Sequence, residues 1–199
     1  MAEGSTDGRE RKSIIDTKAL AATLRARYRP AAKMKTLSLS FFAVAAFIFA
    51  SSIDAKTIKL PNDEFAFAQI TIPDSWEPSE VNNGVEANSP DKAVYISAVG
   101  VGSEKGMDSE IEDTFKMLKD HNVDLDQSSK KEQKFEINGV EANELIFKAK
   151  DEDGPCTVSI TFVPIKNKVV VVTYWVTTSE EEKNSAAVGK IANSIKAAE

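Results

Sequence analysis

Residues 134–177 read KFEINGVEANELIFKAKDEDGPCTVSITFVPIKNKVVVVTYWVT, and this stretch decides the fold. Asn138-Gly139 is the dipeptide that best tolerates two consecutive positive φ values, so it predicts a β-hairpin between Lys134–Ile137 and Val140–Lys148. Turn residues at 152–154 and 166–167 predict two more hairpins, whose following strands are Thr157–Ile165 and Val169–Thr177. Consecutive tight hairpins require antiparallel strands.

The last of these strands contains four consecutive valines, 169–172, which are apolar on both faces of the chain. A strand of this kind is typical of the centre of a sheet that is covered on both sides. The residues that follow predict a covering helix, because Ser179 and Glu182 form a capping box. Its inner stripe would be Val188, Ile191, Ala192 and Ile195.

Three strands and a helix are predicted before this stretch. The strands are Phe65–Ile70, which would close at Pro73, Gly84–Ala87 and Ala93–Val101. An amphipathic helix follows, with Met107, Ile111, Phe115 and Leu118 on its apolar face. We expect Asp108 or Ser109 to cap it, the latter in a capping box with Glu112.

The predicted order is β-β-β-α-β-β-β-β-α, which indicates an α+β domain with helices packed on a largely antiparallel sheet of six to seven strands. Residues 67–76 (FAQITIPDSW), 138–142 (NGVEA) and 191–195 (IANSI) resemble the PsbP-like family. This family includes PsbP of photosystem II, Mog-type Ran-binding proteins and small exported bacterial proteins of the DcrB type. The resemblance covers residues 60–197 and implies a twisted α/β/α sandwich. It implies no function, because its members bind different partners.

The first 55 residues are expected to direct export. Residues 37–50 (LSLSFFAVAAFIFA) follow Lys33 and Lys35, the layout of a signal peptide. We expect residues 34–55 to form that signal, with cleavage after Ala55 or Ser52, and 1–33 to be an upstream start or a dispensable extension. A retained anchor is the alternative, although fourteen residues span only about 21 Å of a roughly 30 Å hydrocarbon core. The predicted location is the periplasm or the secreted fraction.

Charge and composition exclude several function classes. Residues 1–55 hold nine Lys and Arg against five Asp and Glu, whereas residues 56–199 hold sixteen against twenty-six, a charge of −10. This charge disfavours nucleic acid and anionic lipid as partners. One His and one Cys cannot form a zinc site of the usual kind or a disulfide framework. We expect the single Cys156 to be buried in a strand.

Three segments resemble binding motifs without meeting their requirements. Gly100–Gly106 lies between a strand and a helix but has neither the dinucleotide nor the P-loop spacing, so we expect a flexible connection. His121 lies among Asp120, Asp124 and Asp126, which favours a solvated loop over a metal site. Residues 151–154 (DEDG) match part of a calcium loop, but a hairpin turn accounts for them.

Ser-x-x-Lys spacings occur at Ser89 and Lys92 and at Ser128 and Lys131, without the companion motifs of serine acyl enzymes. The sequence therefore predicts no catalytic, cofactor-binding or metal-ligating residues and a protein that is not an enzyme. Of the two tryptophans, Trp175 is expected in the core. Trp76 would either cap the core or line a cleft, and its surroundings are the first hypothesis for a ligand surface.

The predicted function is an exported, non-catalytic binding or accessory protein, monomeric, whose partner is an unknown protein or small ligand. Two alternatives stay open. The first is a signal-anchored protein that displays the same domain at the cell envelope. The second is an enzyme or inhibitor with a carboxylate site, which Asp or Glu side chains with raised pKa values in a cleft would favour.

Overall fold

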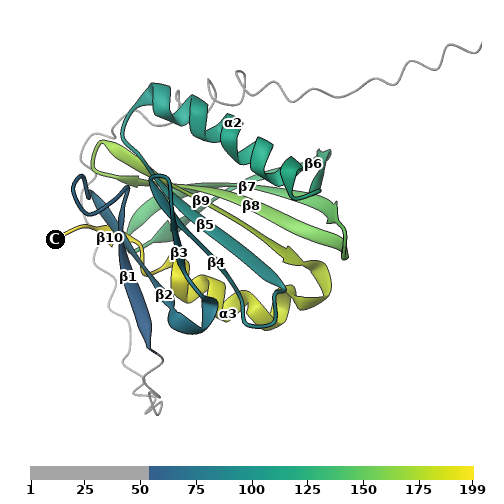
Figure 1. Ribbon diagram of the computed structural model, residues 1–199. Coiled ribbons are helices and arrows are strands. Elements are labelled where there is room, and N and C mark those ends of the chain that lie inside the picture. Colours follow the sequence, from purple (N-terminus) through teal and green to yellow (C-terminus); the bar gives the residue numbers. More distant parts are fainter. Residues whose placement is uncertain (1–53) are drawn as a thin grey trace, which may run out of the picture.

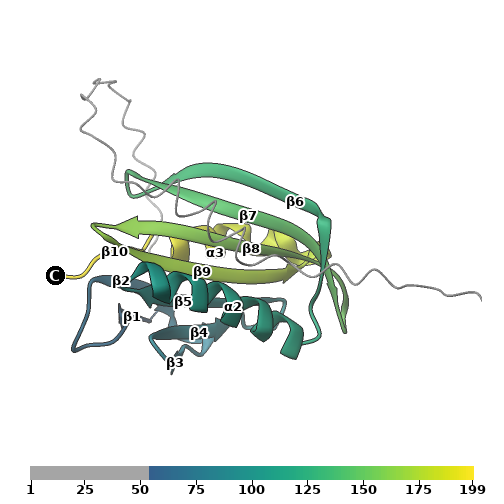
Figure 2. The same cartoon turned by 90° about the horizontal axis from the view of Figure 1, so that it is seen from above.

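The computed structural model describes residues 54–199 and arranges them in three layers (Figures 1 and 2). The middle layer is an antiparallel sheet with strand order β3-β4-β5-β9-β8-β7-β6. Helix α2 (Glu104–Asp120) covers one face, and α3 (Glu181–Ala192) lies on the other face beside a smaller sheet. The strands of the central sheet are β3 (Ser79–Val81), β4 (Gly84–Asn88), β5 (Val94–Val101), β6 (Asp124–Ile137), β7 (Val140–Asp151), β8 (Gly154–Ile165) and β9 (Lys168–Thr177).

The predicted α+β class, with two helices on a mainly antiparallel sheet, is confirmed. The Asn138-Gly139 hairpin is also confirmed, since Ile137 pairs with Val140 and the two turn residues have φ values of 50° and 76°. The hairpins between β7 and β8 and between β8 and β9 close where predicted, at Asp151↔Gly154 and Ile165↔Lys168.

Strand β9 contributes to both hydrophobic cores, as its four valines predicted. Val170 and Val172 lie in the cluster shared with α3 and the smaller sheet. Val171 lies in the cluster beneath α2, with the half-buried Val169 packed against it. The helix stripes are confirmed as well, because Met107, Ile111 and Leu118 are buried in the second cluster. Ile191 and Ile195 are buried in the first, where Val188 and Ala192 pack against it.

A second sheet, which the sequence analysis did not predict, contains β1 (Ala55–Leu60), β2 (Ala68–Pro73) and β10 (Lys196–Ala197) in the order β1-β2-β10. The expected strand at Phe65–Ile70 was placed too early. The side chain of Asn62 accepts hydrogen bonds from the backbone amides of Glu64 and Phe65, at 3.1 and 3.0 Å, which holds that segment in a turn. Short 3-10 helices are η1 (Asp74–Trp76) and η2 (Thr178–Glu180).

Both predicted helix caps are wrong. Helix α2 begins at Glu104 because Ser103 caps it, its hydroxyl accepting a hydrogen bond from the Gly106 amide at 3.1 Å. Helix α3 follows η2 directly, and its N-cap residue Glu180 makes no capping hydrogen bond through its side chain. A capping box at Ser179 requires a non-helical residue there, but Ser179 lies within the 3-10 turn.

The flexible connection expected at Gly100–Gly106 is mostly regular structure. Gly100 belongs to β5, and Gly106 lies in the first turn of α2. A Cβ atom at Gly100 would lie 2.8 Å from the backbone nitrogen of Pro61, so the passing chain requires glycine there. Strand β6 begins at Asp124, ten residues before the predicted start at Lys134, with a register irregularity between Asp126 and Lys131.

The predicted extension at 1–33 and nearly all of the predicted signal at 34–55 lie outside the described residues. Within residues 54–199, neither helix has the length and apolar character needed to cross a membrane.

Candidate functional site

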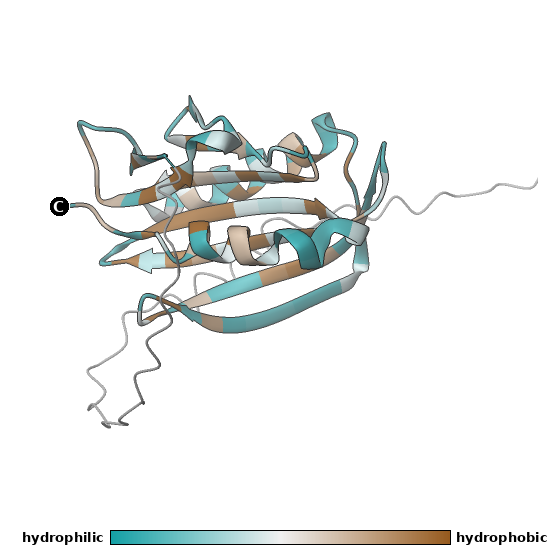
Figure 3. Cartoon of the chain, turned by 90° about the horizontal axis from the view of Figure 1, so that it is seen from below, coloured by the Kyte–Doolittle hydropathy of each residue, from teal (hydrophilic) through white to brown (hydrophobic). Residues whose placement is uncertain are grey.

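A cavity of about 250 Å³ lies between α3 and the central sheet. Figure 3 views the molecule from this side, with α3 crossing in front of the strands. The strand register forms its floor, because Gln133 pairs with Glu144, Glu144 with Thr161, and Thr161 with Val172 across β6, β7, β8 and β9. Cross-strand partners point to the same face of a sheet, so this row projects toward α3.

The walls of the cavity are mainly apolar, and its polar groups are few. The apolar lining residues are Ile96, Phe135, Ile137, Val172, Val176, Val188 and Ala192. The polar lining residues are Gln133, Glu144, Thr161, Tyr174, Glu181, Asn184 and Ser185. An apolar cavity with a small number of polar groups is the usual form of a site for a small molecule.

Glu144 is the charged group on the floor, and it is 6% exposed. Its Oε1 accepts a hydrogen bond from the hydroxyl of Ser159, and its Oε2 accepts one from the side-chain amide of Gln133. Both oxygens are acceptors, the arrangement of an ionised carboxylate. Both donors are neutral, and no ion pair within residues 54–199 includes Glu144.

Tyr174 lines the same cavity, and the negative charge of the cavity affects the pKa of its hydroxyl. Burial raises the pKa of its hydroxyl to about 12, and the neighbouring carboxylates of Glu144 and Glu181 act in the same direction. The Tyr174 hydroxyl is therefore protonated at neutral pH and available as a hydrogen-bond donor to a ligand.

Helix α3 is attached to the sheets at both ends, so the cavity lies beneath a fixed element. Near its start, Lys183 Nζ lies 2.8 Å from Asp91 Oδ2, and Thr157 donates a hydrogen bond of 3.1 Å to Glu181. Beyond its end, the side-chain amide of Asn138 donates to the carbonyls of Asn193 and Ile195, both at 2.7 Å.

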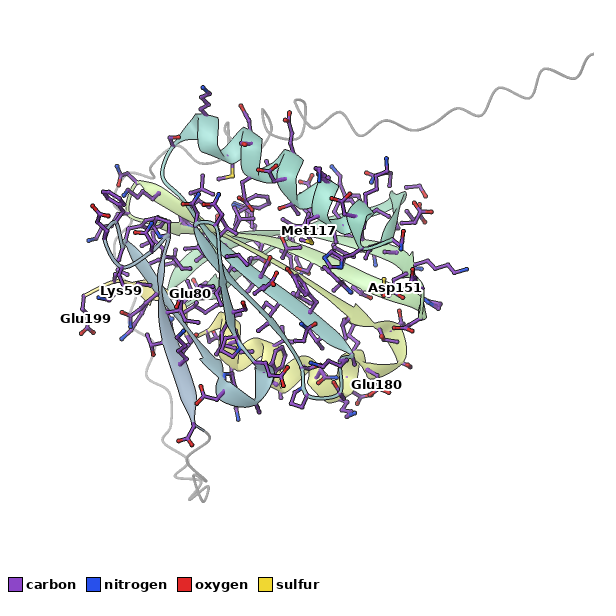
Figure 4. The ribbon with its side chains drawn as sticks, viewed as in Figure 1. Lys59, Glu80, Met117, Asp151, Glu180 and Glu199 are labelled. Atoms are coloured by element: carbon purple, nitrogen blue, oxygen red, sulfur yellow. The ribbon has the colours of Figure 1, made fainter. Side chains whose placement is uncertain are left out.

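A second hollow, an open groove of about 450 Å³, lies on the opposite face between α2 and the β4–β5 edge. In Figure 4, Met117, which lines it, extends from α2 toward the sheet. Carboxylates from both walls reach this groove, Glu86 from β4 and Glu110 and Asp113 from α2. The Tyr95 hydroxyl donates a 2.9 Å hydrogen bond to Glu86.

Glu110 has a raised pKa of about 7, because it is half-buried in the groove and lies close to the negative charge of Asp113. Thr114 is buried beside it and donates a long hydrogen bond of 3.5 Å to its carboxylate, an interaction that opposes the shift. A carboxyl group in a cleft with a pKa near 7 can exchange protons at neutral pH.

Of the two positions that the sequence allows for Trp76, a core cap or a cleft wall, the structure supports the core cap. Trp76 is 4% exposed and belongs to the core cluster beneath the smaller sheet, so it caps the core. It lines neither of the two hollows described above. Trp175, expected in the core, is half-buried at the edge of the other core and stacks on Tyr95 with ring centroids 4.2 Å apart. The ring of His121 lies 5.5 Å from that of Trp175.

The other singled-out residues have structural partners. Cys156 is buried, as predicted, and burial raises its pKa to about 12, with the negative charge of Asp151 acting in the same direction. The Asp151 carboxylate accepts hydrogen bonds from the amides of Asp153 and Gly154, both at 3.0 Å, and so shapes the hairpin turn.

The structure does not bring the Ser-x-x-Lys pairs together as catalytic pairs. Ser89 donates to Asp91, and Lys92 forms an ion pair with Glu77 at 3.1 Å. Ser128 donates to Asp126.

Asp120, which was considered with His121 as part of a metal site, forms an ion pair with Lys116 at 2.6 Å.

The same arrangement of strands and helices occurs in cyanobacterial PsbP from Synechocystis sp. PCC 6803. The superposition has a TM-score of 0.50 at 8% identity and covers 78% of this chain and 99% of that one. The domain has the PsbP-like fold. Likeness at this identity concerns the fold alone. No protein-family model matches the chain, and no curated protein matches it either.

Two further solved structures match this PsbP-like chain at lower TM-scores. LpqN of Mycobacterium tuberculosis, involved in cell envelope biogenesis, has a TM-score of 0.42 at 14% identity, covering 77% of this chain and 98% of that one. The Ran-binding protein Mog1p of Saccharomyces cerevisiae has a TM-score of 0.39 at 10% identity, covering 72% and 95%.

The lining residues Glu144 and Tyr174, and Ser159, which donates a hydrogen bond to Glu144, were not predicted from the sequence. Glu144, Ser159 and Tyr174 occur singly in three different strands, and each fits an outward-facing polar position of a half-exposed sheet. One signal was present in the sequence for Ser159 and Tyr174, because both lie in strands that are otherwise rich in apolar residues. A polar residue in such a strand needs a partner on its own face.

Proposed function

We propose that this protein is an exported, non-catalytic binding or accessory protein that holds a small ligand in the cavity beneath α3. One observation carries the proposal: a buried carboxylate, Glu144, lies on the floor of an apolar cavity of about 250 Å³. Nonfunctional cores seldom retain a charged group next to empty space, because burying it costs free energy that apolar packing avoids.

Export is supported by the sequence. Residues 37–50 form an apolar run behind Lys33 and Lys35, and the residues after 55 carry the acidic charge. We propose a periplasmic or secreted location, with the signal-anchored form as the alternative. Cell fractionation followed by N-terminal sequencing tests this. Soluble material that begins at Lys56 supports the exported form, whereas membrane material that retains residues 37–50 supports the anchored form.

Ligand binding is tested by screening small compounds for those that raise the thermal unfolding midpoint of the protein. The protein is purified in the form in which cells accumulate it. We expect hits whose binding is weakened in Gly189→Leu. Gly189 lines the cavity, and a Cβ atom placed there meets no atom within 4 Å, so a larger side chain enters open space near the α3 wall. Hits that bind Gly189→Leu and wild type equally would place the ligand elsewhere.

A second candidate function, an enzyme that uses a carboxylate pair, is favoured by the groove beneath α2. Glu110 with a pKa of about 7 beside Asp113 has the protonation behaviour of a general acid. A hydrolase assay with activated ester, phosphoester and glycoside substrates separates the two candidates. Turnover that falls as pH rises through 7 and is lost in Glu110→Gln would support the enzyme, and its absence would favour the binding protein.

A further inference from the structure

The charge of the cavity beneath α3 narrows the class of ligand. Two carboxylates line it, Glu144 on the floor and the exposed Glu181 at the α3 wall. Within residues 54–199, no Lys, Arg or His lines the cavity. The interior therefore has negative potential without a protein cation to balance it.

The hydrogen bonding of Glu144 leaves capacity for a ligand. Each carboxylate oxygen can accept about two hydrogen bonds. The structure gives one donor to each oxygen, the Ser159 hydroxyl and the Gln133 amide. A buried carboxylate is stabilised most by a partner that brings both a positive charge and N–H donors, since such hydrogen bonds are roughly twice as strong as neutral ones.

The aromatic rings in the wall suit the same kind of ligand. Phe135 and Tyr174 both line the cavity, from β6 and β9. A cation within about 6 Å of an aromatic ring centre is attracted to the ring face. The apolar residues of α3, Val188 and Ala192, lie opposite and can cover the hydrocarbon part of a ligand.

Resting on the proposed function, we infer that the ligand is a small free amine, with its ammonium group on Glu144 and its apolar body between the sheet and α3. A neutral compound of the same shape keeps the apolar contacts but leaves the carboxylate unpaired. An anion would add repulsion from Glu144 and Glu181. The structure thus predicts selection by charge at nearly constant shape.

The test compares benzylamine, benzyl alcohol and benzoate as probes by titration calorimetry at pH 7. We expect wild type to bind benzylamine at least about tenfold more tightly than benzyl alcohol, with benzoate the weakest. In Glu144→Gln the preference for the amine should disappear while binding of the alcohol persists. The matched control is Glu141→Gln, on the same strand, which removes one charge from an exposed ion pair with Lys134 outside the cavity.

The outcomes separate the two levels of the proposal. If the amine and the alcohol bind wild type equally, the amine inference is wrong while the cavity is still a binding site. If none of the three probes binds, the proposed ligand site itself fails. Should Glu144→Gln not fold, amide chemical shifts in wild type decide the question. Benzylamine must perturb Glu144, Thr161 and Tyr174 more strongly than the alcohol does, and equal perturbation would overturn the inference.

Discussion

The cavity beneath α3 and the groove beneath α2 lie on opposite faces of one sheet and use the same kind of charged residue differently. The cavity, about 250 Å³, is lined by the buried carboxylate of Glu144, whose two oxygens both accept hydrogen bonds from neutral donors. The groove, about 450 Å³, is more polar and contains Glu110, whose carboxyl pKa is raised to about 7. The buried carboxylate of the cavity is stabilised by two neutral hydrogen-bond donors, whereas burial and the nearby charge of Asp113 favour the protonated form of Glu110.

Side chains should be packed more tightly beneath α2 than beneath α3, where the cavity lies. Substitutions that remove apolar atoms at these two places should show the largest difference that we expect. Leu118 of α2 is 1% exposed in a closed core, so Leu118→Ala should lower the free energy of unfolding by about 3 kcal/mol or more. Val188 of α3 is half-buried and faces the cavity, so Val188→Ala should cost about 1 kcal/mol or less. Urea unfolding measures both, and equal costs would contradict an open space beneath α3.

A pH-dependent effect of intermediate size should come from the groove. The pKa of Glu110 is raised from 4.5 to about 7 in the folded protein, so folding is favoured by its bound proton. This contribution is complete below pH 4.5 and is lost as pH rises to about 7, because the folded state then binds more protons than the unfolded state. Glu110→Gln should be more stable than wild type by about 2 kcal/mol at pH 8, and nearly equal to it at pH 4.

Calorimetric unfolding at the two pH values measures this difference. Glu112→Gln is the control, because it removes the same charge from α2. Glu112 is exposed and does not line the groove. A pH profile of Glu110→Gln parallel to that of wild type would show that the groove does not hold a proton at neutral pH.

The smallest effect concerns the attachment of α3. Lys183 bridges Asp91 and Glu180 at 2.8 and 3.0 Å, and the hydrogen bond that it donates to Asp91, together with one from Ser89, holds the pKa of Asp91 well below the ordinary range. The lysine is exposed, so Lys183→Met should cost less than about 1 kcal/mol, and less still in high salt. Urea unfolding against Lys190→Met, an exposed lysine on the same helix, measures it. A cost well above 1 kcal/mol would mean that this bridge stabilises the attachment of α3 more than an exposed ion pair usually does.

Local chemistry explains which parts of the fold could be predicted. Asn138-Gly139 forms its hairpin because both residues tolerate positive φ values. This property belongs to the two residues themselves and does not depend on contacts with distant segments. The predictions of the helix caps were wrong because several nearby polar residues could each serve as an N-cap. Ser103 was chosen over Asp108 or Ser109 by where β5 ends and how the chain enters the α2 layer.

The smaller sheet and the site needed more than local chemistry. Strand β10 has two residues, and its Lys196 and Ala197 pair with Gln69 and Ala68 of β2, far away in the sequence. A pairing of this length leaves no periodicity to detect. The ligand surface was expected at Trp76 because a tryptophan after a turn fits either a core cap or a cleft, and packing selected the core.

The sequence by itself determined the α+β class, the antiparallel hairpins and the strand with two apolar faces, since these follow from turn residues and from periodicities of a few residues. Only the tertiary structure decided that Gln133, Glu144 and Tyr174 line one cavity, with Ser159 hydrogen-bonded to Glu144. Their convergence depends on the register of four strands and on α3 being attached across them. Register and attachment arise from contacts between distant segments, so a charged site can exist here without any motif in the sequence.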